Sequence, residues 1–179
     1  MTAAGRINAV LVAPGASVAE TGVSYGAAVT GAALAAVGAL RAGLDPLPAV
    51  VLAAVGFDLV GGSVVNATAA AKRRFHGAGG SDRRRFAFVA GHMHPFAIAL
   101  LVPGFGWTAA ALAYALSVAG AAAVLAAGPP IRRPLAFAIT AVGSVAALVL
   151  APLPAFLAWI TPVLLVKLLI GHLLPEESR

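Results

Sequence analysis

Long apolar stretches, separated by short groups of glycine, proline or charged residues, make up most of the chain. Because an α-helix rises about 1.5 Å per residue, about 20 apolar residues are needed to cross the roughly 30 Å hydrocarbon core of a bilayer. By this measure the sequence predicts about six transmembrane helices, at residues 23–40, 49–71, 86–102, 107–127, 135–151 and 155–174. The predicted fold is an all-α, polytopic membrane bundle that forms one domain over residues 1–179.

The composition agrees with this prediction and excludes a soluble fold. Apolar residues make up 61% of the chain and charged residues only 10%, whereas a soluble domain has about 25% charged residues. The chain therefore has too few polar side chains to cover a water-exposed surface. It has no cysteine, which excludes disulfides, thiolate nucleophiles and iron–sulfur clusters held by this chain. Abundant alanine and glycine are typical of high-GC bacterial proteins, so we expect a bacterial cell-membrane protein.

The basic residues predict the orientation of the helices. Half of the 12 Lys and Arg residues lie in one basic loop, residues 72–85, between the second and third predicted spans. With six spans, both ends of the chain and the loop with Arg132 and Arg133 fall on the same side, and Arg41 falls in a loop opposite. Since cytoplasmic loops are enriched in Lys and Arg, we expect a multi-pass inner (cytoplasmic) membrane protein with both termini in the cytoplasm. The net charge of +6 follows mainly from this bias.

Residues 1–19 precede the first predicted span and have two interpretations. The stretch is apolar, contains Pro14 and ends in Ser17-Val18-Ala19, a small-residue sequence of the kind found at signal-peptide cleavage sites. Its only basic residue is Arg6, which is weak support for a signal peptide. An interfacial or re-entrant segment is therefore favoured, with a signal peptide as the alternative.

Five polar residues fall within the predicted spans: Asp58, Asn66, His92, His94 and Lys167. Such residues are costly in hydrocarbon and commonly mark functional sites. Counted at about 1.5 Å per residue, Asp58 lies about 21 Å from the cytoplasmic end of its helix and the other four about 9 to 14 Å from theirs. If the second, third and sixth spans meet, these residues line a cavity that opens to the cytoplasm.

The segment Gly-His-Met-His-Pro at residues 91–95 is predicted to distort its helix. On an ideal helix His92 and His94 point about 200° apart, so they cannot both bind one metal ion. Pro95 lacks an N–H group and clashes with the carbonyl group of Gly91, which kinks or breaks a helix. We therefore expect a kinked, functional segment at this position.

The sequence assigns candidate roles to eight residues. The catalytic candidates are Asp58, Asn66, His92 and His94, and the substrate-binding candidates are Lys72, Arg73, His76 and Lys167. A carboxyl group within the membrane could act as a general acid or base, and a histidine as its partner or as a metal ligand. Each group also has a structural alternative: helix–helix hydrogen bonds for the polar residues, snorkelling for Lys167, surface positions for His76 and His172, and lipid contacts for the basic loop.

The favoured function is a membrane-embedded enzyme that acts on a lipid-soluble substrate, an isoprenoid or an acyl lipid, at an Asp/His acid–base or metal site. The alternatives are a small proton-coupled transporter, although the chain lacks the internal repeat of many carriers, and a non-catalytic membrane subunit. The cofactor considered is a divalent metal ion on His92 or His94. Haem is not expected because the histidines are not at matched depths on different helices, and no nucleotide-binding P-loop is present. The expected partners are membrane lipids and a lipid-soluble small molecule, without nucleic acid.

Overall fold

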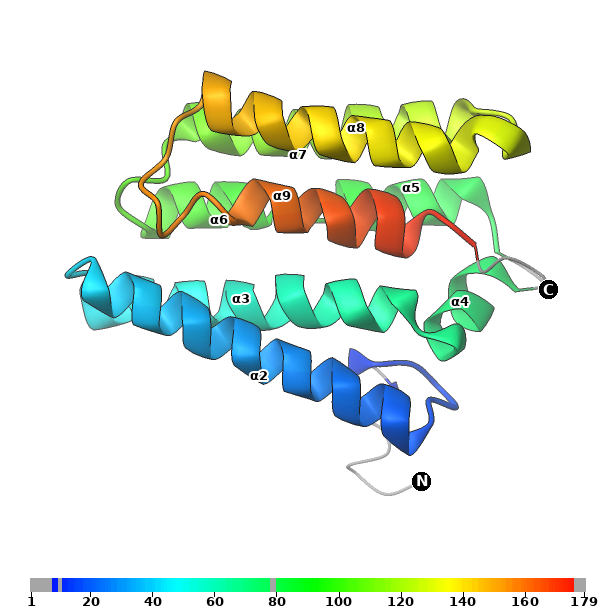
Figure 1. Ribbon diagram of the computed structural model, residues 1–179, viewed down its shortest axis with the longest axis horizontal. Coiled ribbons are helices and arrows are strands. Elements are labelled where there is room, and N and C mark those ends of the chain that lie inside the picture. Colours follow the sequence, from blue (N-terminus) through cyan, green and yellow to red (C-terminus); the bar gives the residue numbers. More distant parts are fainter. Residues whose placement is uncertain (1–7, 10, 78–79, 176–179) are drawn as a thin grey trace.

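The computed structural model describes residues 8–9, 11–77 and 80–175, which form helices and loops without a strand. The long helices lie roughly side by side in three layers (Figure 1). The first layer contains α2 (Val18–Arg41) and α3 (Pro46–Ala67). The middle layer contains α5 (Asp82–Ala90), α6 (His94–Leu101), α9 (Ile160–Leu165) and the π-helix η1 (Val166–His172). The third layer contains α7 (Trp107–Ala126) and α8 (Pro129–Leu150). A short helix, α4 (Ala69–His76), follows α3 at one end of the bundle.

Four of the described helices, α2, α3, α7 and α8, are long and apolar enough to cross a membrane. They support the prediction of a helical membrane protein. The other two predicted spans are not single long helices. Residues 86–102 are divided between α5 and α6, and residues 155–174 hold a turn and then the shorter apolar helix Ile160–His172. The prediction of about six spans is therefore not confirmed, although the corresponding segments lie side by side in the bundle (Figure 1).

Polar side chains cap the starts of α2 and α4, and Thr68 lies where α3 ends. Ser17 caps the N-terminus of α2 and forms a capping box with Glu20. The other carboxylate oxygen of Glu20 accepts a hydrogen bond from the backbone N–H of Ala70 at 3.1 Å, which joins the start of α2 to the start of α4. Thr68 has an extended backbone that ends α3, and its hydroxyl group caps α4. The predicted span 49–71 is thus divided at Thr68.

The basic segments lie together at one end of the bundle. Helix α4, the start of α5, the start of α8 and the end of η1 are all at this end, and the turn between α2 and α3 is at the other (Figure 1). Residues 72–77 and Arg132 are therefore separated from Arg41 by the length of the bundle. The predicted orientation requires this arrangement.

Part of the N-terminal segment packs against the basic end. Residues 1–7 and 10, which include the basic residue of the signal-peptide interpretation, lie outside the described residues. Val12 and Ala13 are buried, and Ala13 packs in a small cluster with Ala70 and Ala71 of α4.

The α2–α3 pair depends on a close approach of the two backbones at Gly31 and Gly56. A β-carbon at Gly31 would lie 2.6 Å from the carbonyl oxygen of Gly56, and a β-carbon at Gly56 would lie 2.5 Å from that of Gly31. Helices associate in membranes largely through such close packing, because lipid chains are as apolar as the side chains. These two glycines therefore fix how closely α2 lies against α3.

We predict that Gly31→Ala destabilises the protein by about 1–3 kcal/mol, because the added methyl group must push the two helices apart. Gly26→Ala is the matched control, since Gly26 lies in the same helix and a β-carbon there would meet no described atom of another segment within 4 Å. The control is expected to be neutral or slightly stabilising, because alanine favours a helix over glycine. Thermal unfolding in detergent compares the two variants, and equal stability would contradict the close contact.

Candidate functional site

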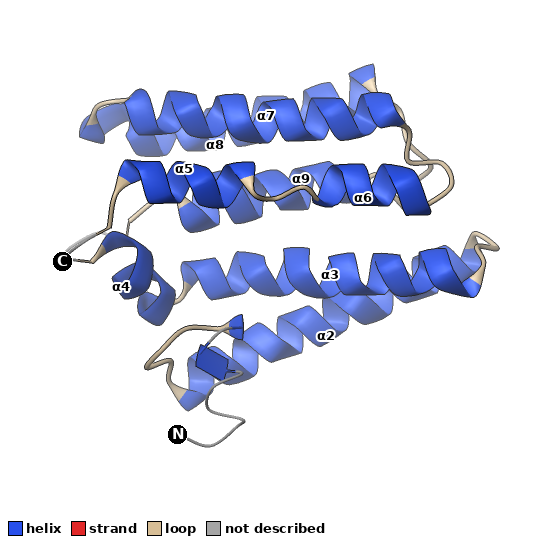
Figure 2. Ribbon diagram, turned by 180° about the vertical axis from the view of Figure 1, so that it is seen from behind, coloured by secondary structure: helices blue, strands red, loops and turns tan. Residues whose placement is uncertain are grey.

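The candidate site lies where α5 ends and α6 begins. Helix α5 is capped by Gly91, and α6 starts at His94 with Pro95 in its first turn, so His92 and Met93 form a short loop between them (Figure 2). The break predicted from Pro95 is confirmed. Tyr114 of α7 donates a hydrogen bond to the carbonyl oxygen of Ala90 at 2.9 Å and satisfies part of the interrupted backbone. Within a membrane, irregular backbone occurs where protein or a cavity surrounds it.

An ion pair forms the centre of the site. The ammonium group of Lys167 in η1 donates a hydrogen bond to the carboxylate oxygen Oδ2 of Asp58 in α3, at 2.6 Å. Nε2 of His94 lies 3.3 Å from the same oxygen. The Lys167 side chain is only 4% exposed, whereas the Asp58 side chain is 42% exposed. Asp58 therefore supplies the negative charge that a buried ammonium group requires, and part of its carboxylate is left accessible.

Two neighbouring residues of α3 hold Lys167 in place. The side-chain amide of Asn66 donates a hydrogen bond to the backbone carbonyl oxygen of Lys167 at 3.2 Å. A β-carbon at Gly62 would lie 2.6 Å from Cε of Lys167, so the absence of a side chain there makes room for the lysine. Asn66, predicted as a catalytic residue, thus contacts the backbone of η1 and positions the lysine.

His92 completes the site from the loop between α5 and α6. Its Nδ1 lies 2.6 Å from the carbonyl oxygen of Phe88 and donates a hydrogen bond to it, which leaves the lone pair on Nε2. Ligand atoms of Asp58, His92 and His94 all lie within 4.8 Å of one another, so these three residues could hold a metal ion. Both histidines face one point because the helix is broken; on a continuous helix they would point apart.

The depths counted along the sequence put Asp58 in a deeper layer than the other polar residues. The structure joins the two layers, because the long Lys167 side chain reaches Asp58 and His94 begins a new helix. Helix α3, the break between α5 and α6, and η1 therefore meet at this cluster, which is the condition under which the sequence predicts one shared cavity. We call Asp58, His92, His94 and Lys167 the central cluster.

A cavity of about 210 Å³ borders Asp58. It lies between the N-terminal segment, α2 and α3, and its lining residues include Leu11, Tyr25, Asp58 and Gly62. A larger cavity of about 570 Å³ lies between α2, α3 and the turn before α9, next to Phe156 and Trp159. Its lining is apolar apart from Thr30 and contains no residue of the central cluster. The accessible space at the carboxylate is thus the smaller of the two.

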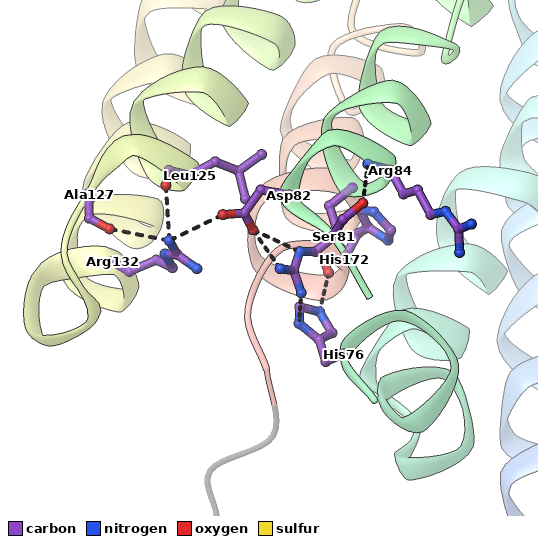
Figure 3. Close-up of polar contacts among 9 residues, drawn as sticks. His76, Ser81, Asp82, Arg84, Leu125, Ala127, Arg132 and His172 are labelled. Atoms are coloured by element: carbon purple, nitrogen blue, oxygen red, sulfur yellow. Dashed lines mark hydrogen bonds and ion pairs between the residues drawn. The ribbon is translucent and has the colours of Figure 1, made fainter. Parts of the chain in front are cut away.

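A second polar group joins α4, α5, α8 and η1 at the basic end (Figure 3). We call its side chains, His76, Asp82, Arg85 and Arg132, the basic-end group. His76 donates a hydrogen bond from Nε2 to the carbonyl oxygen of His172 at 2.8 Å, and Arg85 donates one to Nδ1 of His76 at 2.9 Å. Asp82 pairs with Arg85 and lies 3.9 Å from Arg132. Two of the predicted substrate-binding residues, Lys167 and His76, therefore lie in different clusters.

The other two predicted substrate-binding residues also lie at the basic end. The ammonium group of Lys72 donates hydrogen bonds to the carbonyl oxygens of Gly171 and Leu174, at the end of η1. Arg73 is exposed on α4. The structure thus brings Lys72 to the backbone that follows Lys167, where it stabilises a helix end, and leaves Arg73 on the surface.

His172 is buried, and its predicted surface position is wrong. Its side chain packs against Phe88, with ring centroids 4.0 Å apart, and against Phe75 at 4.7 Å. The residue is 1% exposed, and neither ring nitrogen has a hydrogen-bond partner among the described residues. The sequence placed His172 near the end of a span, but the phenylalanines of α4 and α5 cover it.

The sequence did not assign the supporting roles of Gly62, Tyr114 and Arg85. The glycine pair 61–62 between Asp58 and Asn66 was a usable signal, because small residues on a polar helix face make room for a neighbouring chain. The roles of Tyr114 and Arg85 depend on contacts between distant segments and had no local signal.

We predict that Asp58→Asn destabilises the protein by about 3–5 kcal/mol, because it leaves the buried Lys167 ammonium group without a charge partner. Lys167→Met is expected to cost less, since the remaining carboxylate is partly accessible. The double variant Asp58→Asn/Lys167→Met should be more stable than Asp58→Asn alone. Unfolding measured in mixed micelles for all four proteins gives the interaction free energy, and additive effects would contradict the ion pair.

We also predict a pH-dependent contribution from His76. Burial lowers the pKa of His76 below 6.5; the hydrogen bond to His172 raises it, and the charges of Arg85, Lys72 and Arg132 lower it further. The unfolded chain therefore takes up the proton more readily, so the stability gained from neutral His76 is present above about pH 6.5 and is lost as the pH falls below it. Melting temperatures of the wild type and of His76→Gln, measured between pH 8 and 5, test this prediction. The difference between the two melting temperatures should change below pH 6.5, whereas a difference that stays constant with pH would contradict it.

The central cluster and the basic-end group each bring polar side chains from several helices together. No family model, curated protein or solved structure matches the chain. Its function is therefore inferred from the residues and distances at the break between α5 and α6.

Proposed function

We propose that this chain is a small multi-pass membrane carrier that binds a cation at the Asp58 carboxylate, in exchange with the ammonium group of Lys167. The observation that carries the proposal is the 2.6 Å contact between a nearly fully buried lysine and a partly accessible aspartate. In this state Lys167 acts as an internal counter-ion for Asp58. A cation that enters the cavity can take its place on the carboxylate.

The break between α5 and α6 supports the same proposal. Many carriers bind their substrates near the bilayer midplane at helices interrupted in this way. Here the interruption brings His94 to 3.3 Å from the carboxylate oxygen that also binds Lys167. The π-helix η1 places Lys167 in a second irregular segment, of a kind that is frequent at functional sites. Both irregular segments meet Asp58.

The cavity volumes favour a small ion over a lipid substrate. Pockets for organic ligands typically enclose about 300–1,000 Å³, and the cavity beside Asp58 has about 210 Å³. The apolar cavity of about 570 Å³ is large enough for part of a lipid chain, but it is not lined by the central cluster. An enzyme that acts on an isoprenoid or acyl lipid therefore has weaker support than a carrier.

The membrane assignment has two parts. The four long apolar helices indicate a membrane protein. We further propose that six segments cross the cell inner membrane, with α5–α6 and α9–η1 as the two irregular spans, and that the basic end faces the cytoplasm. The clustering of α4 and the starts of α5 and α8 at one end supports this orientation. Membrane lipids are the expected surroundings, and no nucleic acid is expected as a partner.

Reconstitution into proteoliposomes tests the carrier. Vesicles are given outward or inward gradients of Na⁺, K⁺, Mg²⁺, Mn²⁺ or Zn²⁺, and ion movement is followed by ion-selective dyes, with a pH-sensitive dye to detect protons. The wild type should move at least one cation faster than empty vesicles. Asp58→Asn should reduce this rate at least tenfold, because the binding charge is lost.

Asp45→Asn is the matched control for this experiment. Asp45 precedes α3 at the opposite end of the bundle from α4, and its side chain makes no capping hydrogen bond. The same chemical change there should leave transport unchanged. Ion movement that is equal in the wild type, Asp58→Asn and empty vesicles would overturn the proposal.

A further inference from the structure

We infer that Asp58, His92 and His94 form a binding site for a divalent transition-metal ion, and that this is the class of cation the chain carries. The assignment of the ion as cargo rests on the proposed function. The assignment of the binding site stands on the geometry of the three side chains alone.

The positions of the donor atoms fit one ion. Metal–nitrogen and metal–oxygen bonds to such ions are about 2.0–2.2 Å long, so neighbouring ligands of a tetrahedral ion are about 3.4 Å apart. The ligand atoms of Asp58, His92 and His94 already lie within 4.8 Å of one another. Side-chain movements of less than about 1 Å bring all three to bonding distance.

The orientation of His92 is that of a metal ligand. Metal-binding histidines usually donate their second ring N–H to a carbonyl or carboxylate group, which fixes the tautomer. The Nδ1 of His92 makes this bond to the carbonyl oxygen of Phe88 at 2.6 Å, so Nε2 is left with a free lone pair. The Phe88 ring also packs on His92, with centroids 4.5 Å apart, and limits its rotation.

The donor set selects the class of ion. Imidazole nitrogen suits zinc, nickel, iron, cobalt and copper(II), whereas magnesium and calcium prefer oxygen ligands alone. Two histidines and one carboxylate leave an open coordination position for water, which is typical of sites where ligands exchange. A chain without cysteine offers no thiolate for tighter binding of soft ions.

Lys167 competes with the metal ion for Asp58. Its ammonium nitrogen lies 2.6 Å from Oδ2 of Asp58 and occupies part of the space that the ion requires. Like charges repel strongly in surroundings of low dielectric constant, so the ion binds only when the lysine swings away. Removal of the Lys167 ammonium group should therefore strengthen metal binding. Removal of a residue that helps to hold the metal ligands in place would weaken it instead.

Metal titration of the purified, untagged protein in detergent tests the site. Co²⁺ is the probe, because its visible absorption reports nitrogen coordination and geometry, and Zn²⁺ is added to displace it. The wild type should bind one Co²⁺ per chain. His92→Gln and His94→Gln should each bind at least tenfold more weakly, and Lys167→Met should bind at least tenfold more tightly.

His76→Gln is the control, because His76 lies in the basic-end group with Arg85 and the backbone of His172 as its partners. It should bind Co²⁺ as the wild type does. Circular dichroism and gel filtration establish that each variant is folded. Three results would each overturn the metal site: no Co²⁺ binding by the wild type, wild-type affinity in the His92→Gln or His94→Gln variant, or weaker binding by Lys167→Met than by the wild type.

The transport experiment separates this inference from the proposed function. Co²⁺ binding with the expected variant pattern, but without ion uptake into vesicles, would retain the metal site and overturn the carrier. Movement of Na⁺, K⁺ or protons that depends on Asp58, without Co²⁺ or Zn²⁺ binding, would retain the carrier and overturn the metal site.

Discussion

The buried ammonium group of Lys167 imposes the constraint on which the rest of the site depends. A charge in an apolar bundle costs several kcal/mol unless a partner of opposite charge is held beside it. Asp58 is that partner, at 2.6 Å. Helices α3 and η1 must therefore keep a fixed register to each other. The hydrogen bond from Asn66 to the Lys167 backbone and the space left at Gly62 maintain this register.

The irregular backbone at the α5–α6 break and in η1 brings side chains to Asp58, where the ion pair with Lys167 forms. A continuous helix through residues 86–102 would turn His92 and His94 to opposite faces, whereas the break before Pro95 directs both toward Asp58. Tyr114 compensates for the lost backbone hydrogen bonding at Ala90. The basic-end group, with His76 and Arg85, joins the ends of α4, α5 and η1 and so stabilises the helices that carry the central cluster.

Local features of the sequence predicted the parts of this arrangement that depend on nearby residues. The apolar stretches predicted the long helices, and Pro95 predicted the break, because both follow from backbone geometry within a few residues. The candidate residues Asp58, His92, His94 and Lys167 were found by their cost in hydrocarbon. Their pairing was not predicted, because depth along a helix does not include the reach of a lysine side chain. The burial of His172 depends on Phe75 and Phe88, which come from other helices.

The charges of the central cluster distinguish a site for exchange from a site for permanent binding. With Lys167 on Asp58 the pair is neutral, and the lysine satisfies the carboxylate in the absence of any other cation. A protein that keeps a metal ion permanently gains nothing from an ammonium group on one of the ligands, since the two cations repel each other. A protein that must release its cation does gain, because Lys167 can return to Asp58 as the ion leaves, so that the carboxylate is never left without a partner. The ion pair therefore favours reversible binding.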